Sequence, residues 1–164
     1  MKRLTILLTL FLSCIFFLSQ LQAQRTSVGI MGGASFPILD NGFGVHVGIH
    51  PSYRLNSYLS LEGQASFTTN FIDAGFLSGQ TSRDQFIQLL AGPRIYLSPR
   101  DSKNRYYFNL LLGWGARVSA LRLLDDYNNY FGYSGGFYAQ FSHWILGVGY
   151  ETPQNIFFKI GYQL

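Results

Sequence analysis

The last nine residues of the chain alternate between two kinds of side chain. Successive side chains of a β-strand point to opposite sides, so a strand here would have two distinct faces. One face would carry Ile156, Phe158, Ile160, Tyr162 and Leu164. The other face would carry Phe157, Lys159, Gly161 and Gln163, which are mostly polar or small. This pattern is typical of a strand whose apolar face contacts lipid.

Residues 1–23 have the three parts of a secretory signal peptide. Lys2 and Arg3 form a basic start, an apolar run covers residues 4–18, and Ala23 places a small residue at the expected cleavage point. A retained transmembrane helix is the alternative, but it needs about 20 apolar residues and this run is shorter. We therefore expect secretion with a cleaved signal peptide.

Cleavage would leave residues 24–164 as one domain. Cys14 also raises the alternative of lipoprotein processing, although the residues before it match that signal poorly. Because Cys14 is the only cysteine of the chain, the mature domain has no disulfide, no thiolate metal site and no cysteine nucleophile. We expect no cofactor.

The charge of the mature domain is close to balanced. The full chain has 12 Lys and Arg against 8 Asp and Glu, and removing Lys2 and Arg3 leaves 10 against 8, a net charge of about +2. Such a small excess argues against a strongly polyanionic partner such as nucleic acid. Aromatic residues are abundant, at 17%, which suits strands that end in a membrane interface.

Eight segments of the mature domain alternate as strands do, and the alternation is clearest over residues 42–54. The expected strands are 26–36, 42–54, 58–71, 85–97, 105–119, 133–141, 144–151 and 156–164. If the chain enters from the periplasm, the external connections are 37–41, 72–84, 120–132 and 152–155. The periplasmic connections are then 55–57, 98–104 and 142–143. Long external loops with short periplasmic turns are the asymmetry expected of an outer-membrane barrel.

Only a closed sheet can pair every backbone polar group within hydrocarbon. The sequence therefore predicts an all-β fold, an eight-stranded antiparallel up-and-down transmembrane β-barrel. Aromatic residues near the predicted periplasmic ends fit a membrane interface. These residues are Tyr53, Tyr58, Tyr96, Tyr106, Trp144 and Tyr162. The alternative is a soluble periplasmic barrel of the lipocalin type, with its apolar face inside around a ligand.

Three segments, residues 58–67, 87–96 and 158–164, carry a resemblance to a known family. In them the chain resembles the small outer-membrane β-barrel proteins, the group of the OmpA transmembrane domain, OmpX and PorT-like proteins. The resemblance implies localisation in the cell outer membrane, contact with outer-membrane lipid and lipopolysaccharide, and handling by the barrel-assembly machinery. It also implies an assembly signal at Phe158, Ile160, Tyr162 and Leu164, although the family signal usually ends in Phe.

The predicted inner face gathers ionisable side chains into a polar network. Its members are His46, His50, Glu62, Arg94, Arg117 and Lys159. Pairing Arg54 with Tyr58 across the turn sets His50 opposite Glu62. The same pairing sets Ser52 opposite Ser60 and His46 opposite Ser66. A histidine, a carboxylate and serines together could form a hydrolase-like site. We favour a structural network in which Arg94 neutralises Glu62, since buried charges must be paired and an eight-stranded barrel is filled by side chains.

These observations favour a non-enzymatic outer-membrane protein with a structural or interaction role. The external loops 72–84 and 120–132 are the expected contact sites for another envelope protein or a host protein. A narrow anion-preferring channel is an alternative, because the predicted inner face has more cations than carboxylates. The acidic pair Asp125 and Asp126 does not match the spacing of an EF-hand calcium loop, so no metal site is expected.

Overall fold

A computed structural model describes residues 26–36, 42–73, 81–99, 102–119, 127–153 and 155–164. These residues form the strands β1 (Thr26–Phe36), β2 (Gly42–Arg54), β3 (Leu59–Asp73), β4 (Thr81–Tyr96), β5 (Asn104–Ser119), β6 (Tyr127–Phe141), β7 (Trp144–Glu151) and β8 (Asn155–Gln163). The described chain contains no helix that is long and apolar enough to span a membrane. The predicted signal peptide, the connection at 37–41 and the acidic pair at 125–126 lie outside the described residues.

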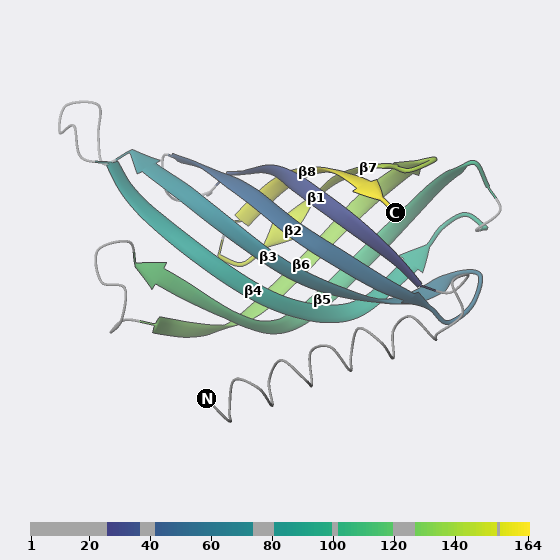
Figure 1. The fold of residues 1–164 in the computed structure, drawn as a ribbon, viewed down its shortest axis with the longest axis horizontal. Helices are drawn as coiled ribbons and strands as arrows, with labels where there is room; N and C mark the ends of the chain where they lie inside the picture. Colours follow the sequence, from purple (N-terminus) through teal and green to yellow (C-terminus); the bar gives the residue numbers. More distant parts are fainter. Residues whose placement is uncertain (1–25, 37–41, 74–80, 100–101, 120–126, 154) are drawn as a thin grey trace, which may run out of the picture.

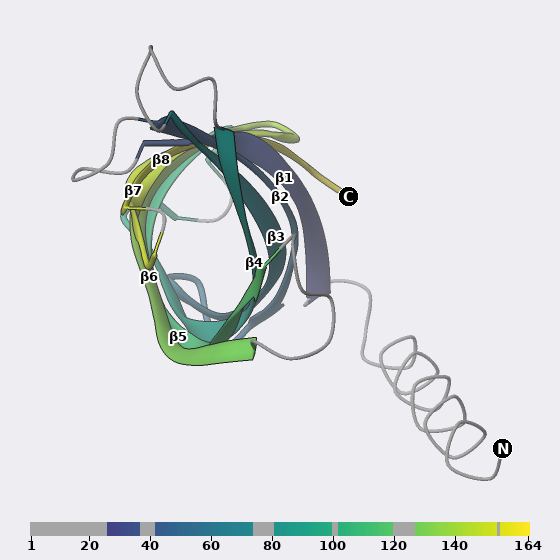
Figure 2. The same cartoon turned by 90° about the vertical axis from the view of Figure 1, so that its left-hand side faces the viewer.

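The strands close into an antiparallel barrel (Figure 1). Each strand pairs with the next, and β8 returns to pair with β1 from Gly29 opposite Gln163 to Phe36 opposite Ile156. Figure 2 shows the resulting ring of strands around a single lumen. The predicted fold class is confirmed, and the closure removes the sheet edges that hydrocarbon would leave unpaired.

Apolar side chains cover the outside of the barrel and polar side chains point inward. On β8, Phe158 is 54% exposed, whereas the neighbouring Lys159 is 3% exposed. The outward set on the other strands includes Ile49, Leu89 and Leu110, all exposed. This arrangement is the reverse of the one that a soluble lipocalin-like barrel requires, because water would then contact the apolar face.

Three strands extend further toward the external end than predicted. The bounds of the predicted loops 72–84 and 120–132 are wrong, since β3 runs to Asp73, β4 begins at Thr81 and β6 begins at Tyr127. Strand residues beyond the membrane need no apolar outer face, so the hydrophobic alternation disappears there while backbone pairing continues.

The β3–β4 and β5–β6 hairpins consequently reach beyond the β7–β8 connection, as the left side of Figure 1 shows. The last β6–β7 pair joins Ser134 to Glu151, whereas β5–β6 pairing continues to Val118 opposite Tyr127. The rim of the barrel at its predicted external end is therefore uneven.

The register across the β2–β3 turn also differs from the prediction. Arg54 pairs with Ser60, not Tyr58, and every predicted partner is shifted by two residues. The N–H groups of Leu55 and Asn56 both donate to the carbonyl of Leu59, at 3.0 and 3.1 Å, which makes the turn longer than the three residues expected. A shift of two keeps each side chain on its predicted face, because the side-chain period of a strand is two.

Inward-facing glycines let the strands curve tightly enough to close. A Cβ atom on Gly33 would clash with the carbonyl of Phe158 on β8, and one on Gly92 would clash with the carbonyl of Leu110 on β5. Neither position can accept a side chain unless the backbone moves. Glycine here reflects a close approach of neighbouring strands.

Candidate functional site

Glu62 is the centre of a buried charge cluster in the half of the lumen near the chain termini. Arg94 Nε donates to Glu62 Oε2 at 2.9 Å, and Asn109 Nδ2 donates to the same oxygen at 3.3 Å. His50 Nδ1 lies 2.9 Å from Glu62 Oε1. Strands β2, β4 and β5 thus each contribute one partner to a carboxylate on β3. We call Glu62, Arg94, His50 and Asn109 the inner cluster.

The guanidinium of Arg94 is held on several sides. Its Nη1 donates to the Tyr96 hydroxyl at 3.3 Å, and its carbon lies 4.4 Å from the ring centroid of Tyr107. Arg94 is 1% exposed and Glu62 is fully buried. Because a buried ion is costly unless all its hydrogen-bonding groups are engaged, this set of contacts is what allows the charge pair to exist in the lumen.

A second cluster lies further along the lumen, around Glu151 of β7. Lys159 Nζ donates to Glu151 Oε2 at 2.6 Å, and Gln64 Nε2 donates to the same oxygen at 3.0 Å. His46 Nδ1 lies 3.8 Å from Glu151 Oε1 and 3.0 Å from the Thr68 hydroxyl oxygen. We call Glu151, Lys159, Gln64 and His46 the outer cluster.

An aromatic layer fills the rest of the lumen beside the two clusters. The rings of Tyr107 and Tyr138 stack with centroids 5.0 Å apart, and Phe157 packs against Tyr138 at 6.2 Å. All eight strands send a buried side chain inward: Met31, His50, Glu62, Arg94, Tyr107, Tyr138, Ile145 and Phe157. The described side chains therefore pack the middle of the barrel, as expected for eight strands.

The predicted network residues divide into two groups instead of forming one site. His50, Glu62 and Arg94 belong to the inner cluster, and His46 and Lys159 to the outer cluster. Arg117 is an exception, because it is exposed near the external end of β5 and not buried in the lumen. Arg117 is on the inward-facing side of β5, but at this position the strand has reached the mouth of the barrel.

The predicted interfacial aromatics are mostly on the outer surface. Tyr58, Tyr106, Trp144 and Tyr162 are exposed, and Tyr53 is half-buried. Tyr96 does not belong to the belt, since it shares the inward parity of Arg94 and packs on Tyr107 with centroids 5.3 Å apart. Tyr96 lies instead between the inner cluster and the predicted periplasmic end of the barrel.

Glu151 is the charged residue of the two clusters that sequence reasoning missed. It is the last residue of the predicted strand 144–151, and a charged residue at a strand end is easily assigned to the following turn. Two signals in the sequence pointed to it. Glu151 is an even number of residues from the inward-facing Ile145, so both lie on the same face of the strand. The predicted inner face also carried several cations but only one carboxylate, Glu62. Since buried cations need counter-charges, a second inward carboxylate was required.

The inner cluster lacks the geometry of a hydrolase. The Ser52 hydroxyl lies 2.8 Å from the Ser27 hydroxyl and has no hydrogen bond to His50. A nucleophile must contact its base, and no described serine does so here. The described residues also contain no group of three or more His, Cys, Asp or Glu side chains able to hold a metal ion.

Comparisons with known proteins agree with this architecture. The model of the outer membrane protein beta-barrel domain family matches residues 7–164. The outer membrane protein Ail of Yersinia pestis, solved in a phospholipid bilayer nanodisc, aligns with a TM-score of 0.53 at 18% identity, covering 85% of this chain and 99% of that one. At this identity the likeness establishes the fold alone.

Two further structures of Ail, the attachment invasion locus protein of Yersinia pestis, align less closely. A crystal structure gives a TM-score of 0.43 at 14% identity, and a complex with the heparin analogue sucrose octasulfate gives 0.41 at 14% identity. Each covers 85% of this chain and 97% of the other. No curated protein matches the sequence.

Proposed function

Because the chain belongs to the outer membrane protein beta-barrel domain family, we propose that it is a non-enzymatic outer-membrane protein that binds partners through its external hairpins. The outer membrane is its location. Its proposed partners at the connections 74–80 and 120–126 are lipopolysaccharide and an envelope or host protein. These residues join β3 to β4 and β5 to β6.

One observation carries this proposal: the lumen is packed while the external hairpins project. The inner and outer clusters fill the middle of the lumen with paired charges, so the projecting hairpins are the surface that is available to a large partner. On β6, beyond its pairing with β7, Phe131 is 68% exposed. Exposed aromatic side chains of this kind are enriched at protein interfaces.

The first test is heat-modifiability of the protein in the outer-membrane fraction. On SDS gels, a closed barrel that resists detergent runs at a different position before and after boiling. A shift in that fraction supports the proposal. An unshifted protein in the soluble periplasmic fraction contradicts it and returns attention to a ligand held within the lumen.

Deleting both external connections is expected to leave the barrel folded. Replacing residues 74–80 and 120–126 with short Gly-Asn turns should keep the gel shift, because β3–β6 are paired along their length without them. Binding of the purified protein to immobilised lipopolysaccharide should fall. Loss of the gel shift would mean that these residues belong to the folded core, and unchanged binding would remove their proposed role.

A planar-bilayer recording tests the channel alternative. We expect no single-channel steps from the native protein, because Arg94, Tyr107 and Tyr138 are buried in the lumen. A resolved anion-selective conductance that falls in Arg94→Ala would contradict a packed lumen and favour the channel. Arg117→Ala is the matched control for charge loss, since Arg117 is exposed whereas Arg94 is buried.

Two biogenesis roles stay proposals. Phe158, Ile160, Tyr162 and Leu164 are exposed along one outer face of the C-terminal segment, which supports their proposed reading by the barrel-assembly machinery. Removal of residues 1–23 is the second, and the mass of the protein isolated from the outer membrane would test it.

A further inference from the structure

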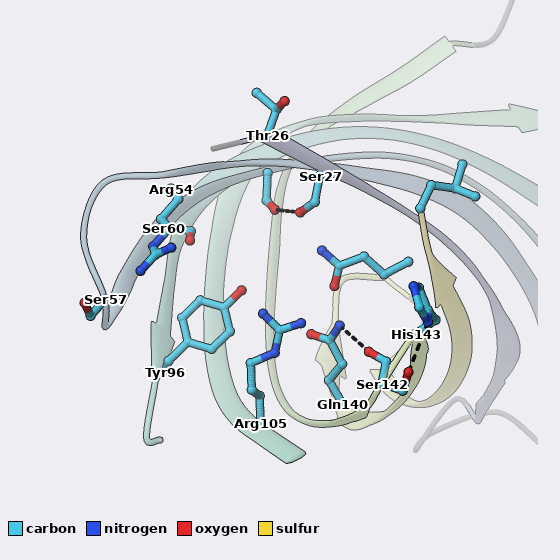
Figure 3. A pocket seen from close by; sticks show the side chains of 13 residues that line it. Thr26, Ser27, Arg54, Ser57, Ser60, Tyr96, Arg105, Gln140, Ser142 and His143 are labelled. Atoms are coloured by element: carbon cyan, nitrogen blue, oxygen red, sulfur yellow. Dashed lines mark hydrogen bonds between the residues drawn. The ribbon is translucent and has the colours of Figure 1, made fainter. Parts of the chain in front are cut away.

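A polar cup opens at the end of the barrel that carries the chain termini, the predicted periplasmic mouth. Its volume is about 380 Å³, within the range of cavities that hold small molecules. The ends of β1, β2 and β8 contribute to its wall, together with residues of β3–β6. Figure 3 shows Arg54, Tyr96 and Arg105 following one another along the cup, with Gln140 next to Arg105 and with Ser142 and His143 beyond it. The cup lies opposite the external hairpins, so it is independent of the proposed function.

The charge of the cup is positive. Arg54 and Arg105 line it, and among its described lining residues none is Asp or Glu. Neither arginine forms an ion pair within the described part of the chain, in contrast to Arg94. Arg54 Nε donates to the carbonyl of Asn56 at 3.0 Å, which leaves its two terminal nitrogens for another acceptor. A low-dielectric wall around such charges raises the local concentration of anions.

Neutral polar groups line the floor of the cup. Ser60 and Gln140 are buried, and Gln140 Nε2 donates to the carbonyl of Ser142 at 3.0 Å. The side-chain oxygens of Gln140 and Gln163 are buried without a hydrogen-bond partner in the described protein. Buried polar atoms in proteins are mostly hydrogen-bonded, to protein or to water, so these two oxygens are available as acceptors to water or to a molecule in the cup.

Tyr96 joins the cup to the inner cluster. Its hydroxyl oxygen accepts a hydrogen bond from Arg94 Nη1, so its own proton is directed elsewhere. Because Arg94 is held in turn by Glu62, the position of the Tyr96 hydroxyl is set by buried contacts. Tyr96 is thus a placed donor on the cup wall, on the same side as the two arginines (Figure 3).

We propose that this cup binds a phosphate group, with Arg54 and Arg105 contacting its oxygens and Tyr96 donating a further hydrogen bond. Guanidinium groups match phosphate with paired hydrogen bonds, and phosphate has enough oxygens to accept from all three residues. Hydroxyl groups attached to that phosphate would pair with the glutamine oxygens on the floor.

Two sources could supply the phosphate: a phospholipid head group of the inner leaflet or a free phosphate of the periplasm. Tyr58 and Trp144, both exposed, lie at the same end of the barrel. Aromatic residues of this kind mark the membrane interface, the depth at which lipid head groups lie.

The test uses the mature barrel in dodecyl maltoside micelles, which contain no phosphate. Inorganic phosphate is titrated while the arginine Nε–H signals are followed by NMR, and short-chain phosphatidylglycerol is then titrated in the same way. We expect a saturable change in the chemical shift of these signals. Arg54→Gln and Arg105→Gln should each lower the affinity derived from it by about tenfold. Lys103→Gln is the matched control, since Lys103 is an exposed cation on a turn at the same end and does not line the cup. It should change binding less than about twofold.

Comparing the binding of the two ligands distinguishes the two possible sources of the phosphate. Saturable binding of phosphatidylglycerol that displaces inorganic phosphate supports the site with a lipid head group as its occupant. Binding of inorganic phosphate alone supports the site with a free phosphate. The proposal is overturned if neither ligand gives a saturable shift, or if Lys103→Gln weakens binding as much as the two cup variants. Heat-modifiability of every variant confirms that the barrel is folded.

Discussion

Replacing Glu62 with Gln is expected to lower the free energy of unfolding by about 3–5 kcal/mol, the cost of leaving one partner of a buried ion pair uncompensated. Arg94 would keep its charge at 1% exposure while losing the carboxylate to which its Nε donates. His50 would lose the charge of its partner as well. Denaturant unfolding in lipid vesicles, followed by tryptophan fluorescence, measures this difference.

A double variant is the control for that result. Glu62→Leu combined with Arg94→Leu removes both charges, so neither is left buried alone. We expect its stability to be closer to that of the native protein than the single variant's, because a buried ion pair is often replaceable by apolar residues at little cost. A loss below about 1 kcal/mol in Glu62→Gln would show that water reaches the cluster, because an exposed pair contributes no more than that.

An arginine at position 110 is expected to destabilise the barrel by about 2–4 kcal/mol, the cost of a cation at the middle of a lipid-facing surface. Leu110 is 56% exposed on β5 and lies midway between Tyr106 and Trp114, the outward aromatic residues that flank the apolar band on this strand. Its side chain would therefore meet hydrocarbon far from either interface.

Leu97→Arg is the matched control for this variant. Leu97 is 58% exposed, similar to Leu110, but it follows the end of β4 beside the turn at 98–103. A cation at that level reaches the interface, so the expected cost is about 0–1 kcal/mol. The same unfolding assay compares both variants. Equal losses at the two positions would mean that the apolar band does not lie across the membrane at the depth assigned to it.

Much of this fold could be predicted from the sequence, because a strand's two faces repeat every two residues. His46 and His50 were assigned to the correct inner face although the β2–β3 register was shifted by two. An even shift preserves parity, so the error changed partners without turning any side chain to the other face. The strand ends beyond the membrane could not be predicted, since no apolar face marks them there.

The sequence predicted which residues face the lumen better than it predicted which of them contact one another. Glu62 and Arg94 were expected as partners, and their side chains are 2.9 Å apart. The division into two clusters and the contribution of Glu151 were not foreseen. Each depends on which strands face one another across the lumen, and a sequence pattern describes one strand at a time.

The sequence by itself determined the fold class: eight segments of alternating apolar and polar residues predict an antiparallel β-barrel, and closure of the sheet satisfies its backbone. Only the tertiary structure decided which side chains contact one another in the lumen. Lys159 meets Glu151 on neighbouring strands, whereas Gln64 reaches that same carboxylate from β3, 87 residues away in the chain. Closure of the barrel brings β3 and β7 within hydrogen-bonding distance across the lumen, so no local pattern could have encoded that contact.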